Sequence, residues 1–221
     1  MTVVALDGPV ASGKSSVARA VATALGYVYI DTGAMYRAIG LLAEEAGVSL
    51  EDEAAVVVVV RNADLRFDTE GRLFAGGRDV SAALRTLAAG AAASRVSALP
   101  GVRSLLVERQ RLLARDVDVV MEGRDIGTNV FPDAEVKVYL TARPEVRSER
   151  RAVELRARGE VVADEEVLAA LEERDRRDST RNVAPLRRAA DAVEIDTSTM
   201  TFTEVVAAVL ALVHARVGVV Q

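Results

Sequence analysis

Eight residues near the N-terminus have the types and the spacing needed to hold the phosphates of a nucleotide. The segment from Gly8 to Ser15 reads GPVASGKS: two glycines with four residues between them, followed by a lysine and a hydroxyl residue. Glycine lacks a Cβ, so backbone N–H groups can approach crowded phosphate oxygens closely. The pattern places Lys14 at the outer phosphates and the Ser15 hydroxyl at a magnesium ion. Nucleotide binding is therefore the first hypothesis.

The lysine of this segment also stands out against the rest of the chain. The sequence has 28 Lys and Arg residues, and only Lys14 and Lys137 are lysines. A chain that otherwise uses arginine for its cations keeps a lysine at the one position where the phosphate-binding pattern requires it. A chance glycine turn before a helix remains the alternative, but the match in pattern and context favours phosphate binding.

The elements around the segment are those that a phosphate-binding loop requires. Residues 3–6 form a short apolar run that predicts a buried strand, and residues 16–25 predict a helix ended by Gly26. The other predicted core strands alternate with helices and cover residues 27–30, 117–121, 136–140 and 192–195. Alternating strands and helices with short connections predict an α/β fold with a five-stranded parallel, doubly wound sheet.

One stretch interrupts this alternation. Short apolar pieces separated by glycines between Ala63 and Ser81 predict a small antiparallel β insertion. Just before it, residues 54–60 are ambiguous, because the valines favour a strand whereas the acidic start and the alanines favour a helix; we predict a helix. A further predicted helix is capped by Asp31 or Thr32 and runs through Arg37 to Ala46. The other predicted helices cover residues 86–99, 102–115, 143–158, 164–182 (with Asp164 as its cap) and 203–217.

Composition bounds the class of protein. A chain of 221 residues is long enough for a single α/β domain with a modest insertion. The formal net charge is −5 and there are only eight Phe and Tyr residues and no Trp, so nucleic-acid binding is disfavoured. There is no cysteine, and no apolar run approaches the length of a membrane span. We therefore expect a soluble, cytoplasmic protein that binds neither nucleic acid nor membrane.

A charged group near residue 178 is a candidate ligand site. Arg174, Asp178 and Arg181 are spaced to share one helix face, and Val167 and Leu171 extend the same stripe. The charged residues thus continue the side that apolar residues turn inward. Half-buried arginines need anionic partners, and Asp178 alone cannot serve both. A bound anion is favoured, and an internal ion network remains the alternative.

Three other charged groups follow predicted strands or lie near one. Arg124 and Asp125 sit in a glycine-flanked turn after residues 117–121, where open α/β sheets bind ligands. The segment from Asp31 to Arg37 follows the second strand, and a simple helix cap would also explain it. A basic helical stretch contributes a last cluster, for which phosphate binding and internal pairing with glutamates are equally open: Arg147, Arg150, Arg151 and Arg158.

Taken together, these motifs resemble those of the bacterial cytidylate kinases. The resemblance rests on Gly8 to Ser15, on DTGAMYR at residues 31–37, on EGRDIGT at residues 122–128, and on residues 174–186. It covers nearly the whole chain. It implies an adenylate-kinase-like core, here residues 1–221 as a single domain, that moves the γ-phosphoryl group of ATP, with Mg²⁺, onto CMP or dCMP. It also implies an acceptor-side insertion at 61–100, a lid-like segment at 143–163, and a monomer.

The resemblance further implies roles for individual residues. The acceptor base would contact Thr32, Arg103 and Asp125; the acceptor phosphate Arg37, Arg124 and Arg181; and the sugar Arg174 and Asp178. Lys14, Arg124, Arg174 and Arg181 would be the catalytic cations, and Ser15 the magnesium ligand. The ATP-binding residues would be Gly8, Ala11, Ser12, Gly13, Lys14, Ser15, Ser16, Arg151 and Arg158. Arg158 stands where the family often has lysine, which keeps the charge.

Two other functions remain open from the residues alone. The chain could be a kinase for another small acceptor, such as UMP or a non-nucleotide metabolite. It could also be a nucleotide-dependent switch that binds a triphosphate without an acceptor. A GTPase-type switch should carry an Asn/Thr-Lys-x-Asp motif, and the sequence has none.

Overall fold

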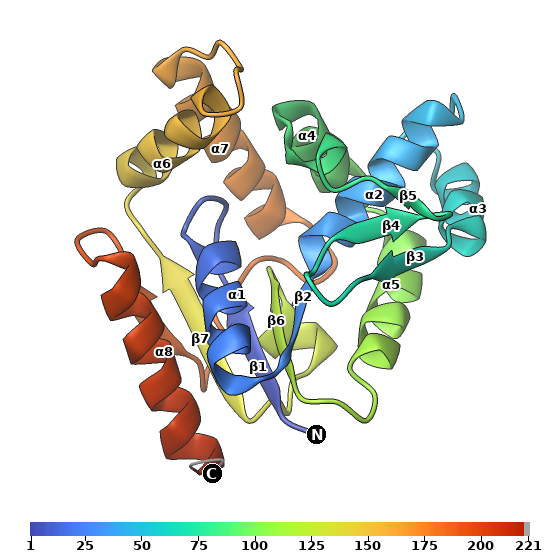
Figure 1. Cartoon of the computed structure of the whole chain (residues 1–221). Coiled ribbons are helices and arrows are strands. Elements are labelled where there is room, and N and C mark those ends of the chain that lie inside the picture. The colour runs from blue at the N-terminus through green and yellow to red at the C-terminus, as the bar shows by residue number, and fades with distance from the viewer. Residues whose placement is uncertain (219–221) are drawn as a thin grey trace. The chain divides into compact units, whose positions relative to one another are not determined.

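The computed structural model describes residues 1–218 and divides the chain into two compact units (Figure 1). One unit joins Met1–Tyr29 to Asp116–Gln221, and the other is Ile30–Arg115. The first unit contains the segment Gly8 to Ser15 and the candidate residues after position 116. The second contains Thr32, Arg37 and Arg103. The two units are described in turn.

A five-stranded sheet is the frame of the first unit. Its strands in spatial order are β2 (Val28–Asp31), β6 (Val119–Gly123), β1 (Val3–Asp7), β7 (Val136–Thr141) and β8 (Val193–Asp196). The central strand β1 pairs in parallel with β6 and β7, and β7 pairs in parallel with β8. All five residues of β1 are buried, as expected for a strand flanked on both sides in a parallel sheet. The ends of β1, β6 and β7 meet at one edge.

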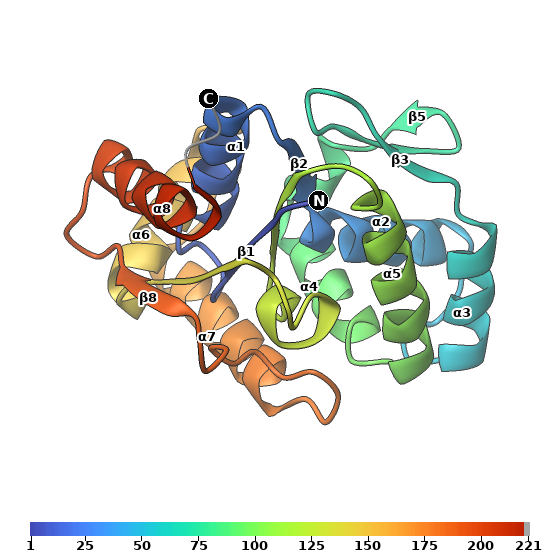
Figure 2. The same ribbon diagram turned by 90° about the horizontal axis from the view of Figure 1, so that it is seen from below.

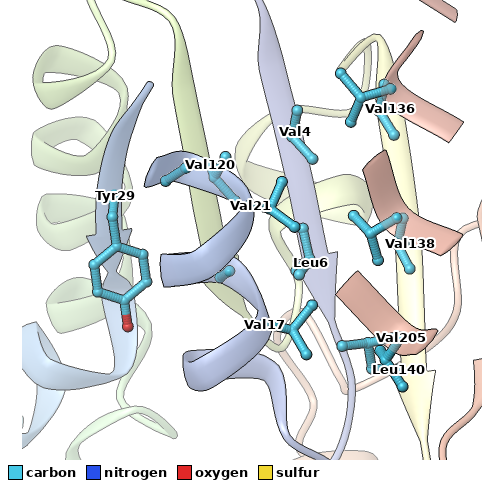
Figure 3. Packing of buried hydrophobic residues seen from close by; sticks show 14 residues of the cluster. Val4, Leu6, Val17, Val21, Tyr29, Val120, Val136, Val138, Leu140 and Val205 are labelled. Carbon is cyan, nitrogen blue, oxygen red and sulfur yellow. The ribbon is translucent and has the colours of Figure 1, made fainter. Parts of the chain in front are cut away.

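Two helices cover one face of this sheet. α1 (Lys14–Leu25) and α8 (Phe202–Val217) lie side by side in Figure 2, and both contribute to the main apolar cluster. Figure 3 shows Val17 and Val21 of α1 and Val205 of α8 packed over Leu6 and Val138 of the strands. α8 begins with a capping box, in which the Thr201 hydroxyl and the Glu204 carboxylate satisfy the free N–H groups of its first turn.

Two further helices, α6 (Pro144–Arg156) and α7 (Asp164–Thr180), pack against each other (Figure 1). Asp164 is not the cap of α7 as the sequence predicts, because Ala163 takes that position and Asp164 is the first helical residue. The Asp164 carboxylate accepts a hydrogen bond from Arg156 instead. A short π-helical turn, η2 (Ile126–Val130), follows β6.

The second unit combines four helices with a small sheet. The helices are α2 (Thr32–Glu45), α3 (Glu53–Asn62), α4 (Leu87–Val96) and α5 (Pro100–Leu113), with a 3-10 turn η1 (Ala83–Arg85). The antiparallel strands are β3 (Leu65–Phe67), β4 (Leu73–Ala75) and β5 (Arg78–Asp79). Helix α2 approaches α4 closely, since a Cβ on Gly40 would lie 2.8 Å from the Cβ of Ala92.

The predicted fold class is confirmed. The five-stranded sheet and the separate antiparallel sheet are both present. The ambiguous valine run is the helix α3: Val56 and Val60, four residues apart, are buried, and Asp52 caps the helix by accepting from the N–H of Ala55. Across residues 1–218, no helix is both long and apolar enough to cross a membrane.

Candidate active site

The segment from Gly8 to Ser15 forms the turn between β1 and α1, and its glycines are required by geometry. Gly8 has a φ of 149°, and a Cβ there would lie 2.0 Å from the carbonyl oxygen of Leu140. Gly13 has a φ of 91° and caps α1 in the left-handed region. Ala11 also has a positive φ, 59°, although it carries a side chain. The backbone is therefore held in a curled conformation at the end of the central strand.

Lys14 is buried at the start of α1. Its ammonium group donates to the Pro9 carbonyl oxygen at 2.5 Å and to the Ser12 hydroxyl at 3.3 Å. Burial, and then the positive charge of Arg124, lower the pKa of Lys14 to about 7. Lys14 is thus a buried amine whose charged form a negative ligand would stabilise.

Glu122 is a site residue that the sequence reasoning did not single out. It is buried at the end of β6, where its carboxylate accepts from the Ser15 hydroxyl at 2.9 Å and from the Tyr29 hydroxyl. The only signal in the sequence is its place at the carboxyl end of a predicted strand, because its contact with Ser15 joins residues far apart in the chain. The Ser15 hydroxyl and a carboxylate are hard oxygen donors of the kind Mg²⁺ prefers, so the residues present fit this ion.

Arg124 and Arg174 share one carboxylate, that of Asp178. Arg124 Nε donates to Asp178 Oδ2 at 2.9 Å, and Arg174 Nε lies 4.0 Å from the same oxygen. The Asp178 side chain is 5% exposed. Burial acts to raise the pKa of Asp178, but Arg124, Arg174 and Arg181 together hold it below its usual value. Asp178 therefore stays charged and gathers the guanidinium groups around it.

Arg181 makes its ion pair with a different acid. Its guanidinium lies 3.3 Å from Asp125 Oδ1, and its Nε donates to the Ala184 carbonyl oxygen at 2.7 Å. Helix α7 ends at Thr180 and Arg181 is in an extended conformation, so the predicted common helix face does not include it. It is nevertheless buried beside Asp125, because the chain turns back after the helix. The internal network that remained as an alternative is therefore present, with Asp178 and Asp125 as its acids.

Asp7 is a second residue that the sequence did not reveal. It ends β1, and its two carboxylate oxygens accept from the backbone N–H groups of Ile126 and Gly127, each at 2.8 Å. Burial is the main cause that raises the pKa of Asp7 to about 6. Asp125 stands immediately before this turn and also accepts from the Asn129 side-chain amide at 3.1 Å. The strand that leads into the phosphate segment thus also fixes the turn that carries Asp125.

In the second unit, Asp31 organises the start of α2. Its Oδ1 accepts from the N–H of Ala34, and its Oδ2 accepts from Arg37 at 2.7 Å. Gly33 leaves room for this pair, because a Cβ there would lie 2.9 Å from the Arg37 guanidinium. Asp31 is therefore the helix cap, as one explanation of this motif predicts. The same carboxylate fixes the orientation of the Arg37 guanidinium.

The other two candidates in this unit are buried polar residues. Thr32 is 4% exposed and Arg103 is 2% exposed. The guanidinium carbon of Arg103 lies 5.7 Å from the centre of the Tyr36 ring, within cation–π range. Arg103 also donates to the Ser97 carbonyl oxygen at 3.5 Å. The Arg103 guanidinium is therefore held in place by the Tyr36 ring and the Ser97 carbonyl oxygen.

The basic cluster on α6 and just after it divides into two pairs. Arg151 and Arg158 both contact the Glu154 carboxylate, at 2.7 Å and 2.5 Å. Arg147 and Arg150 instead reach other elements, Asp175 and Thr197 respectively. Internal pairing with a glutamate is therefore present at Arg151 and Arg158. Phosphate binding by the same two arginines stays open, because a phosphate could replace the Glu154 carboxylate.

The fold and the phosphate segment define the class of protein. A strand, a glycine-rich turn and a helix beginning with Lys14 and Ser15, in a parallel sheet, make a P-loop nucleotide-binding protein. A solved structure of an uncharacterized protein from Eubacterium ventriosum has a similar fold, with a TM-score of 0.52, 11% sequence identity, and coverage of 98% of this chain and 100% of that chain. At that identity the likeness concerns the fold alone.

Comparison with known families is more specific. Residues 4–215 match the family described as cytidylate kinase. A cytidylate kinase from Pelotomaculum thermopropionicum is 48% identical over 216 residues, which cover 96% of each chain. A bifunctional pantoate ligase/cytidylate kinase from Synechococcus is 49% identical over 208 residues, and the match covers 91% of this chain but 38% of that protein. The chain belongs to the cytidylate kinase family and is thus a nucleoside monophosphate kinase.

Proposed function

We propose that the protein transfers the γ-phosphoryl group of ATP to CMP or dCMP, giving ADP and CDP or dCDP. The observation that carries this proposal is the contact between the strand that leads into the phosphate segment and the turn after Asp125: Asp7 accepts from the N–H groups of Ile126 and Gly127, each at 2.8 Å. The phosphate segment with Lys14 and the segment that bears Arg124 and Asp125 therefore lie at the same edge of the sheet. Transfer between two phosphates needs cations on the donor side and on the acceptor side to lie near each other.

The donor side is assigned to the phosphate segment and to α6. Backbone N–H groups and side chains of the segment would hold the ATP phosphates, with Lys14 at the outer ones. The assigned residues are Gly8, Ala11, Ser12, Gly13, Lys14, Ser15, Ser16, Arg151 and Arg158. Arg151 and Arg158 would exchange Glu154 for phosphate oxygens, to which a guanidinium fork can donate two parallel hydrogen bonds.

The magnesium ligand is assigned to the Ser15 hydroxyl, which is hydrogen-bonded to the Glu122 carboxylate. Magnesium supplies charge neutralisation at the transferring phosphates. Glu122 already accepts from the Ser15 hydroxyl, so it can orient that oxygen or bind an ion's water ligand. Removing the carboxylate should raise the magnesium concentration at which the reaction reaches half its maximal rate.

The acceptor-binding residues are assigned from the family resemblance. In the first unit, Arg124 and Arg181 would bind the CMP phosphate, Arg174 and Asp178 the sugar, and Asp125 the base. In the second, Arg37 would bind the phosphate, and Thr32 and Arg103 the base. Residues 61–100 are proposed as the acceptor-side insertion and residues 143–163 as the lid. That the 221 residues act as a single domain, and as a cytoplasmic monomer, also stays a prediction.

The mechanism follows from these assignments. Phosphoryl transfer asks the protein for alignment and charge neutralisation more than for covalent chemistry, so no general base is assigned. Lys14, Arg124, Arg174 and Arg181 would be the catalytic cations. The carboxylates around them keep the guanidinium groups oriented before substrate arrives, which lowers the reorganisation needed during transfer.

A coupled ADP-release assay tests the proposal. ATP and Mg²⁺ are supplied with CMP, dCMP, UMP, AMP or no acceptor. We expect ADP release to depend on CMP or dCMP, with UMP and AMP much poorer. Equal ADP release without any acceptor would instead favour a nucleotide-dependent switch, and a preference for UMP would favour a different acceptor specificity.

A further inference from the structure

An ion pair between Arg147 of α6 and Asp175 of α7 contacts the backbone of the phosphate segment. Arg147 Nη1 donates to Asp175 Oδ2 at 2.5 Å. The Arg147 side chain is 7% exposed and that of Asp175 is 20% exposed. Arg147 Nε also donates to the Ala142 carbonyl oxygen at 3.0 Å, just beyond the end of β7. The pair is therefore anchored to the sheet.

Both partners also contact one residue of the phosphate segment, Val10. Arg147 Nη1 donates to the Val10 carbonyl oxygen at 3.1 Å, and Asp175 Oδ1 accepts from the Val10 N–H at 3.4 Å. The two polar backbone groups of Val10 are thus taken by one ion pair. The next residue, Ala11, has a φ of 59°, a strained conformation for a residue that carries a side chain. Such strain persists only where surrounding contacts determine the backbone.

The charge of Asp175 supports the same explanation. Asp175 lies close enough to Lys14 to influence its pKa, so it stands beside the place where a triphosphate would bind. A lone carboxylate there would repel phosphate. Paired with Arg147, the carboxylate is neutralised and its remaining oxygen is directed at Val10. Asp175 can therefore accept from the Val10 N–H without adding net negative charge beside the place where the triphosphate would bind.

A second contact of α6 acts on the same segment. The Arg150 guanidinium donates to the Thr197 hydroxyl at 2.9 Å and to the Thr197 carbonyl oxygen at 2.6 Å. The single proton of the Thr197 hydroxyl can be donated to the Thr141 carbonyl oxygen, at 3.1 Å, or to the Ser12 carbonyl oxygen, at 3.3 Å. Helix α6 therefore contacts the phosphate segment directly at Val10, and its Arg150 holds a threonine that lies beside Ser12.

We propose that Arg147 and Asp175 are positioning residues that hold the phosphate segment in its nucleotide-binding conformation, and so link α6 and α7 to the donor site. Neither residue needs to touch ATP. The inference rests on the proposed function for its catalytic consequence, but the binding of a nucleotide to the P-loop is enough to test it. Loss of the pair should weaken the donor side of the reaction more than the acceptor side.

The test compares Arg147→Met and Asp175→Asn with the wild type. The amide introduced by Asp175→Asn keeps one carbonyl oxygen, so only one of the two contacts of Asp175 would be satisfied. We expect the Kd for ADP, measured by calorimetry without acceptor, to rise at least tenfold in each variant, and KM for ATP to rise similarly. KM for CMP should change less than threefold. The double variant should be little worse than either single variant, because the pair acts as a unit.

Arg176→Met is the matched control. Arg176 is adjacent to Asp175 on α7 and is exposed, paired with Glu173 of the same helix. The control variant should bind ADP within twofold of wild type. Unchanged ADP binding in Asp175→Asn would overturn the inference, as would equal increases in KM for ATP and CMP together with a lower Tm, which indicate a general packing role. If the wild type fails to phosphorylate CMP, the proposed function is refuted. The ADP-binding comparison still tests the role of the Arg147–Asp175 pair in that case.

Discussion

At the scale of single residues, the site is a set of buried charges that are partly balanced before any substrate binds. Asp178 holds Arg124 and Arg174, and Asp125 holds Arg181. Lys14, by contrast, is held by neutral oxygens and lies under the influence of Arg124. Because burial and Arg124 disfavour the charged form of Lys14, a negatively charged ligand would stabilise that form strongly.

The first prediction concerns protons taken up with ATP. Because the pKa of Lys14 is about 7 in the free protein, this group is mostly neutral at pH 8. Bound phosphates raise its pKa, so binding of MgATP at pH 8 should take up roughly one proton at this group. At pH 6 the ammonium is already charged, and this uptake should nearly vanish. Calorimetry in buffers of different ionisation enthalpy measures it; no uptake at pH 8 would contradict the assignment.

Asp125 is predicted to govern the choice of acceptor base. If its carboxylate accepts from the cytosine amino group, Asp125→Ala should lower kcat/KM for CMP by about 2 kcal/mol, or about 30-fold, while sparing ATP affinity. UMP lacks this amino group and should lose much less. Steady-state kinetics with both acceptors decides. Equal losses would mean that Asp125 acts by orienting Arg181, its ion-pair partner.

At the scale of elements, the fold could be predicted largely because apolar periodicity and glycine positions are local signals. The core strands and most helices begin and end within a few residues of the predicted ranges. The end of α7 was missed, because the sequence continues in helix-compatible residues to Asn182 while the chain turns at Arg181. Contacts between distant elements left no local signal, which is why Asp7, Glu122 and the Arg147–Asp175 pair were not among the candidate residues.

The pair between Arg181, after α7, and Asp125, before η2, leads to a prediction about stability. Both side chains are buried, at 6% and 7% exposure, so Arg181→Met leaves a buried carboxylate without its guanidinium partner. The free energy of unfolding should fall by about 3 kcal/mol. If Arg181 also binds the CMP phosphate, the rise in Tm that CMP causes should be lost as well.

A double variant separates these two effects. Adding Asp125→Asn to Arg181→Met removes the stranded charge and should recover part of the lost Tm. It should not recover the stabilisation by CMP. Thermal melts with and without CMP provide the comparison. A CMP-induced shift equal to that of wild type in Arg181→Met would count against Arg181 as an acceptor ligand.

At the scale of the whole molecule, the chain combines a P-loop unit with a second unit of four helices and a small sheet. The family motifs are distributed over both: residues 8–15 and 122–128 in the first, and residues 31–37 in the second. The fold alone defines a nucleotide-binding protein. The proposed preference for a cytidine acceptor rests on residues assigned from the family resemblance, and a direct assay tests it.

The most direct test follows the transferred group itself. Wild-type protein is incubated with [γ-³²P]ATP, Mg²⁺ and CMP, and the products are separated by chromatography. The account predicts label in CDP, and a loss of at least about 3 kcal/mol in the barrier, roughly 150-fold in rate, for Lys14→Ala with the fold retained. Label that appears only as inorganic phosphate, or CDP formed by Lys14→Ala at the wild-type rate, would contradict it.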